Sequence, residues 1–555
     1  MKTLVVSLLR LGDIVCATPV LHSLRRAGHE VHLLINDNFR QIVDILPELD
    51  GVHFFPRSVL QEEIRDLSAG SWSSVDRVTH LLRDLEDMKF DCVINLTHNR
   101  QSAWLVGAIP APCKLGLEKN HQGEASIHGA WFRFLDERNH LHGTMFHHVD
   151  IFKQGVGLDP SPLGLQLRED AQAIAKAESW SRSAGTKRIL VQVTTSDPKK
   201  NWQFESWADL FRYLTQLRPK TEFLILCSPD EEVLLLPWVE ALHAQQLPVR
   251  LAVVSLAEVL SLCRRSDLVI TVDTSIKHIA AATSTPILEI ALGSGNFHEL
   301  GTYREKSWIV ASRAACYPCR HSESCSQPTH LCSQKLPAEM LAVAAHKILD
   351  SAHGDLRILA REYADLVSLH EVIAIAGVGW WAHDLAEQLD SGFLLSLLEK
   401  MAWALMLGKQ TEGSLPEYGS YGLRLAEVVQ RCFPGLARRE WMKALNAAAY
   451  QLEKQAVESS SLTQRLRRTL AQSADLAEAR RNILGDLQLR QLQLNEDHRP
   501  LDYATTLGQL LGYRGNSDFS HLRRISQEVQ DLSGRLEAER RMLHTLTERI
   551  MGHEC

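Results

Sequence analysis

The stretch with the clearest chemical potential begins as a short apolar run and ends as an alanine-rich segment. It spans residues 268–286 and reads LVITVDTSIKHIAAATSTP. Residues 268–272 are typical of a buried strand, and the residues after Asp273 are typical of a helix. Thr274 or Ser275 suits the cap of that helix, because a hydroxyl accepts a hydrogen bond from a free amide of the first turn. A strand, a polar turn and a helix N-terminus together predict a seat for a phosphate.

Four basic side chains stand near this predicted seat. Lys277 and His278 lie in the first turn of the helix, while Lys199 and Lys200 follow a separate strand. Lysines at such a strand end pair with a diphosphate as point charges. The alternative is structural, since a histidine on an alanine-rich helix is often packed and a loop lysine is usually solvated. We favour the diphosphate site of a nucleotide-sugar enzyme.

A carboxylate stands at the end of the first predicted strand. Residues 4–9 form this strand, Leu11-Gly12-Asp13 forms the turn, and residues 14–27 form a helix. A sugar transferase that inverts configuration needs a carboxylate or an imidazole to take the proton of the acceptor hydroxyl. Asp13 has the position for this role, because ligands gather at the C-terminal ends of parallel strands. The alternative is that Asp13 only caps the helix.

Weaker signals come from one acidic cluster and one histidine cluster. Acidic residues 230–232 open a helix after a strand over residues 222–227; capping is their default role, and a hydrogen bond to a ribose or base is the alternative. The histidines lack the further ligands that a metal site needs. We expect a loop and then a helix from about Phe146, with His148 reaching an acceptor-facing cleft. The cluster comprises His140, His142, His147 and His148.

Composition limits the classes of function. With 555 residues, the chain is expected to form two or three domains. Its net charge of −7 does not support nucleic-acid binding or a broadly basic membrane face. No apolar run approaches the ~18 residues that span a bilayer, and Arg10 and Asp13 interrupt the N-terminal apolar segment, which favours a strand over a signal peptide. The 11 cysteines are odd in number and mostly scattered, which favours a reducing cytoplasm.

Short apolar runs alternate with helical segments over most of the chain. This alternation predicts an α/β fold with parallel, doubly wound sheets in residues 1–165 and 166–350. The turn at residues 293–296 is rich in small residues, where a ligand would approach the backbone closely. The expected strands are residues 4–9, 31–35, 52–55, 92–96 and 114–117 in the first part, and 188–194, 222–227, 268–272 and 286–291 in the second.

Four cysteines are concentrated in residues 316–332, with the spacing C-x2-C-x5-C-x6-C. Four thiols with a CxxC knuckle suit tetrahedral zinc or iron. Such a site would be structural, because four sulfur ligands leave no open position for catalysis. Disulfides, or a cysteine loop without metal, are the alternatives. The four are Cys316, Cys319, Cys325 and Cys332.

Residues 355–555 are predicted to be almost free of strands. Apolar residues between Ile525 and Ile550 recur at steps of four and three, which indicates a heptad seam with Glu539 as its one break. Residues 462–494 indicate another long helix, so we expect an all-α domain built as a helical pair or bundle. Its simplest role is a scaffold or a homo-oligomer contact; a peripheral membrane role through basic patches is the alternative.

The order of these motifs resembles glycosyltransferase family 9, the ADP-heptose heptosyltransferases. The resemblance covers residues 1–350 and is carried by the Leu11–Pro19 turn, by Lys200-Asn201-Trp202 and by residues 255–286. It implies a GT-B architecture of two facing Rossmann-like domains, with the acceptor on the first and the donor on the second. Ser275 stands where the family usually has glycine, and a serine Cβ narrows the approach of a phosphate to the backbone.

The resemblance also assigns roles to residues. Asp13 becomes the general base, with Gly12 and His148 on the acceptor side. The residues implied to hold the donor ADP-heptose are Lys200, Glu231, Asp273, Thr274, Ser275 and His278. No catalytic metal is expected, although some protein-modifying relatives bind iron through cysteines.

Three functions therefore stand as hypotheses. The first is an inverting, cytoplasmic transfer of heptose from ADP-heptose to a hydroxyl of a lipopolysaccharide core acceptor. The second has a Ser or Thr hydroxyl of a protein as the acceptor. The third, of another class, is a non-catalytic nucleotide-sugar-binding or assembly protein that acts through its helical tail.

Overall fold

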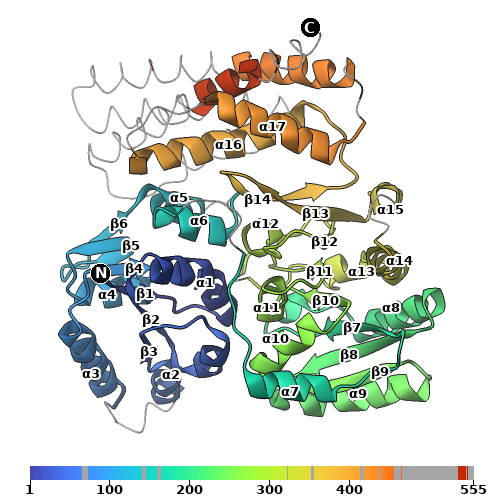
Figure 1. Cartoon of the computed structure of the whole chain (residues 1–555), viewed down its shortest axis with the longest axis horizontal. Coiled ribbons are helices and arrows are strands. Elements are labelled where there is room, and N and C mark those ends of the chain that lie inside the picture. The colour runs from blue at the N-terminus through green and yellow to red at the C-terminus, as the bar shows by residue number, and fades with distance from the viewer. Residues whose placement is uncertain are drawn as a thin grey trace. The chain divides into compact units, whose positions relative to one another are not determined.

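The computed structural model divides into two compact units, Met1–Ala386 and Glu387–Cys555. The larger unit contains two lobes, each built on a sheet with helices on both faces, drawn in blue and in green to yellow in Figure 1. The structure describes residues 1–65, 73–139, 145–158, 164–321, 323–351, 356–412, 418–435, 437, 439–454, 464, 535–545 and 547.

The first lobe has a six-stranded sheet in the order β3-β2-β1-β4-β5-β6. All neighbours are parallel except β5 and β6. Its strands are β1 (Lys2–Val6), β2 (Glu30–Asn36), β3 (Gly51–Phe55), β4 (Cys92–Asn95), β5 (Cys113–Lys119) and β6 (Ala125–His128). Its helices are α1 (Leu11–Arg26), η1 (Asp37–Ile45), α2 (Arg57–Arg65), α3 (Ser73–Asp87), α4 (Arg100–Ala108), α5 (Ala130–Asn139) and α6 (His148–Gly155).

The second lobe has an eight-stranded sheet in the order β14-β13-β12-β11-β10-β7-β8-β9. Its strands are β7 (Lys187–Gln192), β8 (Thr221–Cys227), β9 (Val249–Val253), β10 (Leu268–Val272), β11 (Ile287–Ala291), β12 (Ser307–Ser312), β13 (Val367–Ile375) and β14 (Gly379–Asp384). Its helices are α7 (Ala171–Ser179), η3 (Pro198–Lys200), α8 (Phe204–Leu217), η4 (Pro229–Glu231), α9 (Glu232–Ala244), α10 (Leu256–Arg264), α11 (Ser275–Ala281), α12 (Phe297–Leu300), α13 (Leu331–Gln334), α14 (Ala338–Leu349) and α15 (Leu356–Glu362).

The central strands of both sheets explain why the sequence predicted them well. Every residue of β10 and β11 is buried, and four of the five residues of β1 are buried. Parallel strands covered by helices on both faces are apolar throughout, so they appear as uninterrupted apolar runs. The predicted α/β class is confirmed, while each sheet is parallel at its centre and antiparallel at one edge.

Strands β13 and β14 lie in the stretch that we expected to be almost free of strands. β13 pairs antiparallel with β12, and β14 pairs antiparallel with β13, which extends the second sheet at one edge. Two glycines turn the chain between them, Gly377 with φ of +73° and Gly379 with φ of +121°. This hairpin breaks the strand–helix alternation on which the sequence interpretation relied.

The smaller unit is helical in its described part. It contains α16 (Ser391–Glu412) and α17 (Tyr418–Cys432), and residues 439–454 and 535–545 are also helical. Glu539, the break in the predicted seam, is buried and pairs with Arg535, whose guanidinium also donates to Glu399 at 2.7 Å. Leu536 and Leu543 of the seam are buried. The rest of the predicted seam, the helix at 462–494 and most of the basic patches lie outside the described residues.

One helix of the smaller unit corrects an expectation about membranes. Residues Ser391–Gly408 of α16 form an 18-residue window with mean hydropathy 1.2, enough by length and composition to cross a bilayer. However, 61% of this window is buried, and it contains Glu399 and Lys400. The buried core helix of a globular domain has the same properties, so this is weak evidence for a span.

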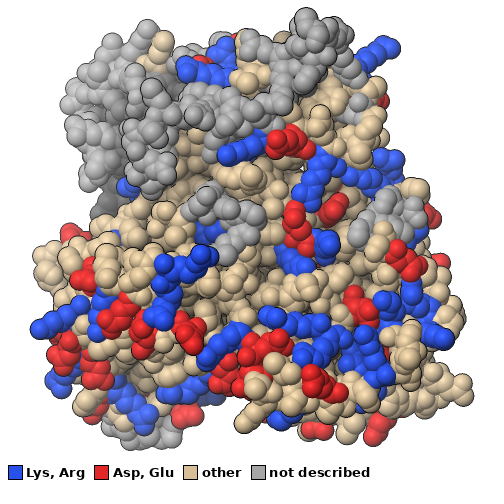
Figure 2. Space-filling view, in the orientation of Figure 1, with Lys and Arg blue, Asp and Glu red and all other residues tan. Residues whose placement is uncertain are grey.

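Charges of both signs are mixed over the described part of the face in Figure 2. Acidic and basic side chains lie next to one another on both lobes, and they do not gather into one broad basic field. This agrees with the net charge of −7. Mixed charge gives little attraction to a nucleic-acid backbone.

Candidate functional site

The strand–turn–helix junctions of the two lobes meet at the N-termini of α1 and α11. A Cβ placed on Gly12 would lie 3.0 Å from Cδ2 of His278 and 3.9 Å from Cα of Ser275. The thiol of Cys16 lies 3.5 Å from Nδ1 of His278. Arg10 also contacts His321, a residue of the second lobe. The first turn of α1 therefore packs directly against the predicted diphosphate segment, and glycine at position 12 permits the close approach.

Asp13 lies at this junction and is partly buried. Its carboxylate accepts a hydrogen bond from the backbone N–H of Arg10 at 3.1 Å, which is the predicted capping contact. Burial raises the pKa of Asp13 to about 6, although Arg10 and Lys200 lower it. The negative charge of Asp273 in the second lobe contributes to the raised pKa. A carboxylate with this pKa is ionised at neutral pH yet basic enough to take a proton from a hydroxyl in a transition state.

Four charged side chains of the second lobe form a chain of alternating sign. Nζ of Lys200 lies 2.6 Å from Oδ2 of Asp273, and the other oxygen of Asp273 contacts the ammonium of Lys277. Nζ of Lys277 also lies 2.8 Å from Oε1 of Glu289. Oε2 of Glu289 accepts hydrogen bonds of 2.8 Å from both N–H and Oγ1 of Thr302. Sequence reasoning missed Glu289, because a single glutamate in an apolar strand gives no motif.

The ionic network holds its charges in spite of burial. Burial alone would raise the pKa of Asp273, but Lys277 and Lys200 hold it well below its ordinary value. Burial would lower the pKa of Lys277, but Asp273 and Glu289 raise it above its ordinary value. Both groups are therefore charged at neutral pH.

Two expected cations of the first helical turn do not have the predicted role. The side chain of Lys277 is 1% exposed and points between two carboxylates, so its ammonium is not presented to a ligand. Burial, together with the nearby Lys277, lowers the pKa of His278 to about 3. His278 is therefore a neutral imidazole at physiological pH, able to donate a hydrogen bond but not to supply a charge.

The two neighbouring lysines of the second lobe also differ. The ammonium of Lys199 donates to the carbonyl oxygens of Arg320 and His321, each at 3.1 Å, and also to that of Glu323. Lys199 therefore fixes the cysteine-containing loop. Lys200 is the lysine of the pair that reaches the network at the end of β10.

The predicted cap of α11 is present. Thr274 is the N-cap, and its hydroxyl accepts a hydrogen bond of 3.0 Å from the N–H of Ile276. Ser275 is the first residue of the helix and is partly exposed. Glu231 has both carboxylate oxygens in use, since one accepts from Oγ1 of Thr194 at 2.6 Å and the other from Ser228 at 2.7 Å. Its default capping role is therefore visible.

The small-residue turn after β11 is approached closely by the protein itself. A Cβ on Gly293, which has φ of +58°, would lie 2.2 Å from the carbonyl oxygen of Lys199. A Cβ on Gly295 would lie 2.9 Å from Oδ2 of Asp273. The glycines thus let this turn close over the ionic network, where we had expected a ligand to approach.

The acceptor side predicted for His148 contains a second histidine that the sequence reading missed. His98 follows β4, and Oγ1 of its neighbour Thr97 accepts a hydrogen bond from the N–H of Leu8 at 2.7 Å. Nδ1 of His98 lies 3.9 Å from Oδ1 of Asp136. Both ring nitrogens of His98, and Nε2 of His148, are buried without a hydrogen-bond partner among the described residues. Burial lowers the pKa of each to about 4. These neutral imidazoles suit hydroxyl groups, which both donate and accept hydrogen bonds.

Of the other histidines of that cluster, His147 has a structural role, and the remaining two lie outside the described residues. His147 caps α6 through Nδ1, and its Nε2 lies 2.8 Å from the carbonyl oxygen of Gly301 in the second lobe. Asp150, two residues into the helix, accepts from the hydroxyl of Tyr303 at 2.7 Å and from the N–H of Trp380 at 2.9 Å. These contacts join the lobes. His140 and His142 lie outside the described residues.

The four cysteines of the 316–332 loop are free thiols. They are near enough to one another that, after burial, the charges of Cys332, Cys316 and Cys325 raise the pKa of Cys319. Among the described residues, however, no group of three or more His, Cys, Asp or Glu side chains is arranged to hold a metal ion. The zinc or iron site therefore stays a prediction.

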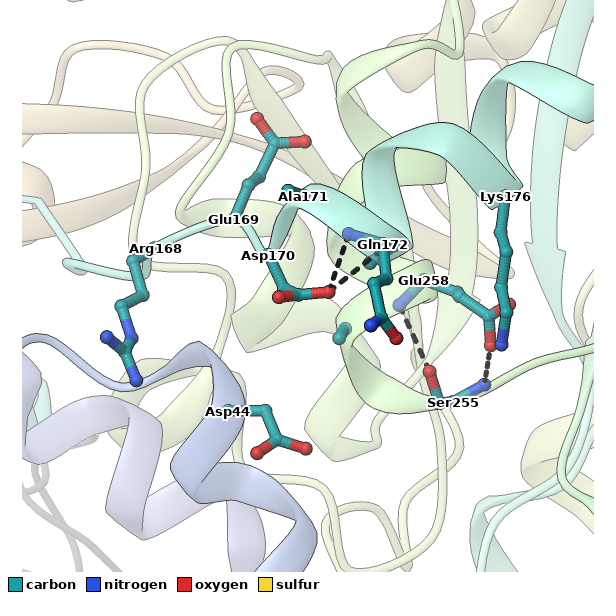
Figure 3. A pocket seen from close by; sticks show the side chains of 11 residues that line it. Asp44, Arg168, Glu169, Asp170, Ala171, Gln172, Lys176, Ser255 and Glu258 are labelled. Atoms are coloured by element: carbon teal, nitrogen blue, oxygen red, sulfur yellow. Dashed lines mark hydrogen bonds and ion pairs between the residues drawn. The ribbon is translucent and has the colours of Figure 1, made fainter.

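A polar pocket of about 470 Å³ lies elsewhere in the larger unit (Figure 3). It is lined by Asp44 of η1, residues 168–173, Lys176 of α7 and residues at the start of α10. Asp170 caps α7, and Lys176 pairs with Glu258 at 3.4 Å, so the lining serves local structure. It shares no residue with the site described above.

Comparison with known proteins gives one family and several relatives. The model of glycosyltransferase family 9 (heptosyltransferase) matches residues 78–330. This range includes the ionic network of the second lobe but not Asp13. Lipopolysaccharide heptosyltransferase 3 of Escherichia coli (strain K12) is 23% identical over 292 residues, which cover 50% of this chain and 79% of that protein.

Two solved structures have a backbone fold similar to part of this chain. A glycosyl transferase of family 9 from Veillonella parvula DSM 2008 has a TM-score of 0.48 at 20% identity, covering 63% of this chain and 97% of that one. The ADP-heptose heptosyltransferase II of E. coli has a TM-score of 0.47 at 14% identity, covering 64% of this chain and 100% of that one.

Proposed function

We propose that this chain moves a heptose from ADP-heptose to a hydroxyl of a lipopolysaccharide core sugar. The proposal starts from the match of residues 78–330 to the model of glycosyltransferase family 9 (heptosyltransferase). The observation that carries the proposal is the meeting of Asp13 with the ionic network of the second lobe. Lys200 and Asp273 both act on the pKa of Asp13, so the base and the diphosphate side lie at one junction. The two lobes then correspond to a GT-B arrangement.

The reaction is an inverting displacement. The acceptor oxygen attacks the anomeric carbon of the heptose as its proton passes to a carboxylate oxygen of Asp13. The bond between that carbon and the β-phosphate oxygen breaks, and ADP departs with the electron pair. A base of pKa about 6 suits this transfer near neutral pH. No metal takes part in these steps.

The donor side supplies charge and hydrogen bonds to the departing diphosphate. Lys200 provides the ammonium, and the N-terminus of α11 with Thr274 and Ser275 provides hydroxyl and amide groups. Neutral His278 donates a hydrogen bond. Asp273 orients Lys200 through the contact of 2.6 Å. In this proposal Glu231, which follows β8, also accepts a hydrogen bond from a ribose hydroxyl beside its contacts with Thr194 and Ser228.

The acceptor side is the first lobe. His98 and His148 offer buried ring nitrogens that have no hydrogen-bond partner among the described residues, which suits a polyhydroxylated sugar. The lipopolysaccharide core is preferred as the acceptor because the matched relative is a lipopolysaccharide heptosyltransferase. We place the reaction in the cytoplasm, with the helical unit as a contact between copies of the chain.

The test is a reaction of the purified chain with ADP-heptose and a heptose-containing core oligosaccharide. We expect ADP release that depends on the acceptor, and mass spectrometry should show one added heptose on it. The matched control is Asp13→Asn, which keeps the shape of the side chain but removes the base. Retained ADP binding with lost turnover supports the proposal.

Two outcomes would contradict it. A heptose found on protein Ser or Thr, with none on the oligosaccharide, would replace the acceptor. ADP bound by the wild-type chain without any turnover on either acceptor would favour the non-catalytic binding protein.

A further inference from the structure

The ionic network of the second lobe has an outer half and an inner half. Lys200 and Asp273 form the outer half, with side chains that are 9% and 10% exposed. Lys277 and Glu289 form the inner half, and each is 1% exposed. Thr302 closes the inner end, because its N–H and hydroxyl both donate to Glu289. A ligand therefore has access to the outer half only.

Neighbouring members of the network compete for the same partners. Asp273 offers one oxygen to Lys200 and the other to Lys277. Lys277 in turn divides its ammonium between Asp273 and Glu289. A nucleoside diphosphate that binds Lys200 must draw this lysine away from Asp273, at least in part. Asp273 would then be a buried carboxylate that needs another cation.

We propose that Lys277 and Glu289 are positioning residues that set how readily Lys200 leaves Asp273 for the diphosphate of a bound nucleotide. This inference rests on the proposed function. Lys277 stays with Asp273 when Lys200 turns to the phosphate, so the carboxylate is never left unpaired. Glu289 opposes this by holding Lys277 on its other side. Neither residue touches the ligand.

This arrangement predicts effects of opposite sign on nucleotide affinity. Without the charge of Lys277, Asp273 has Lys200 as its one remaining partner in the network and holds it more tightly, so ADP binds more weakly. Without the charge of Glu289, Lys277 turns wholly to Asp273 and Lys200 is released more readily, so ADP binds more tightly. A purely structural role predicts weaker binding in both cases, because both variants would loosen the same site.

The experiment is calorimetric titration of the full chain with ADP. We expect the Kd of Lys277→Met to rise about tenfold, near the value of one hydrogen bond to a charged group. We expect the Kd of Glu289→Gln to fall by roughly threefold, since the glutamine oxygen still accepts from Thr302. Lys277→Met leaves a buried carboxylate without its partner and could fail to fold for that reason. In that case the double variant Lys277→Met/Glu289→Gln is measured in its place, and the Kd of the double variant for ADP should also be higher than that of the wild type.

A double-mutant cycle tests whether Lys277 affects ADP binding through Lys200 or through the direct electrostatic attraction between its own ammonium and the phosphates. In a Lys200→Met chain, Lys277→Met should have no further effect on the Kd of ADP. If the two effects add instead, Lys277 acts on the phosphate directly and the proposal is overturned. Weaker binding in Glu289→Gln, at an unchanged melting temperature, overturns it as well.

A matched control lies at the opposite ends of the strands. Arg188 and Glu222 form another buried pair at 2.6 Å, at the starts of β7 and β8. Glu222→Gln removes a carboxylate of the same kind and should leave the Kd of ADP unchanged. If the wild-type chain does not bind ADP at all, the proposed function itself fails; if it binds but the signs agree, only the role of Lys277 and Glu289 fails.

Discussion

In the first lobe, burial moves Asp13 and His148 toward their neutral forms, whereas the four charged side chains of the second-lobe network are buried as ion pairs. The pKa of Asp13 is raised to about 6 and that of His148 is lowered to about 4, chiefly by burial. In the second lobe, Asp273 keeps a lowered pKa and Lys277 a raised one, because each faces an opposite charge. The difference agrees with the roles that we propose for the two sides. A base must exchange a proton near neutral pH, while the seat of a leaving diphosphate must hold positive charge throughout.

The largest effect that would test this comparison is loss of the base. Asp13→Asn should lower kcat by on the order of 10²- to 10⁴-fold, because no group then takes the acceptor proton. The Kd of ADP should stay close to that of the wild type, since the change lies on the other lobe. Rates come from ADP release and affinity from calorimetry. A variant that loses binding and turnover together would show that the two lobes do not divide the work in this way.

Loss of the outer lysine should show the converse pattern. Lys200→Met should weaken ADP binding by about tenfold to a hundredfold, the range for a hydrogen bond to a charged group. It should also raise the pKa of Asp13, because Lys200 lowers that pKa in the wild type. The pH–rate profile of the variant should therefore shift to higher pH. An unshifted pH–rate profile would show that Lys200 does not affect the pKa of the catalytic base.

The pH dependence of the wild-type enzyme follows from the sign of the Asp13 shift. The base must be ionised to accept a proton, so kcat/KM should rise with pH and level off above the pKa of about 6. Below that pH the slope should be about tenfold per unit for a single group. His278, with its pKa lowered to about 3, should add no step in this range. A profile that falls with rising pH would exclude Asp13 as the base.

A smaller effect should come from the contact between α1 and α11. Gly12→Ala places a Cβ 3.0 Å from the ring of His278, so one of the two must move by a few tenths of an ångström. We expect kcat to fall by roughly two- to tenfold through misplacement of Asp13. Gly164→Ala is the control, because a Cβ there meets nothing within 4 Å. Equal rates in both variants would mean that the junction is looser than the structure shows.

The smallest effect should come from the cysteine loop. Cys319→Ser should leave the Kd of ADP within about twofold, because the loop is held by other contacts. Tyr317 donates to the carbonyl oxygen of Gly295 at 2.7 Å, and the N–H of Cys319 donates to that of Gly293 at 2.8 Å. Metal analysis of both proteins tests the four-thiol prediction: stoichiometric zinc or iron in the wild type that is lost in the variant would establish it.

Particular residues show how far the sequence reached. The strand before Asp273 and the cap at Thr274 were predicted with nearly correct bounds, because apolar runs and capping hydroxyls are local signals. The hairpin of β13 and β14 was missed, because the prediction relied on the alternation of strands with helices, which this hairpin breaks. The sequence left open whether His278 is charged or packed, because the burial that lowers its pKa to about 3 is not visible in a motif.

The α/β class, the central parallel strands of both sheets and the polar turns at their ends were determined by the sequence alone, through periodicity and capping that act within a few residues. The tertiary structure decided which of four basic side chains stays charged and within reach of a ligand. Lys199 turns to backbone carbonyls, Lys277 is enclosed by carboxylates and His278 is neutral, while Lys200 remains at the edge of the network. These outcomes depend on neighbours that are distant in sequence, since solvation and ion pairing are set by the packed structure.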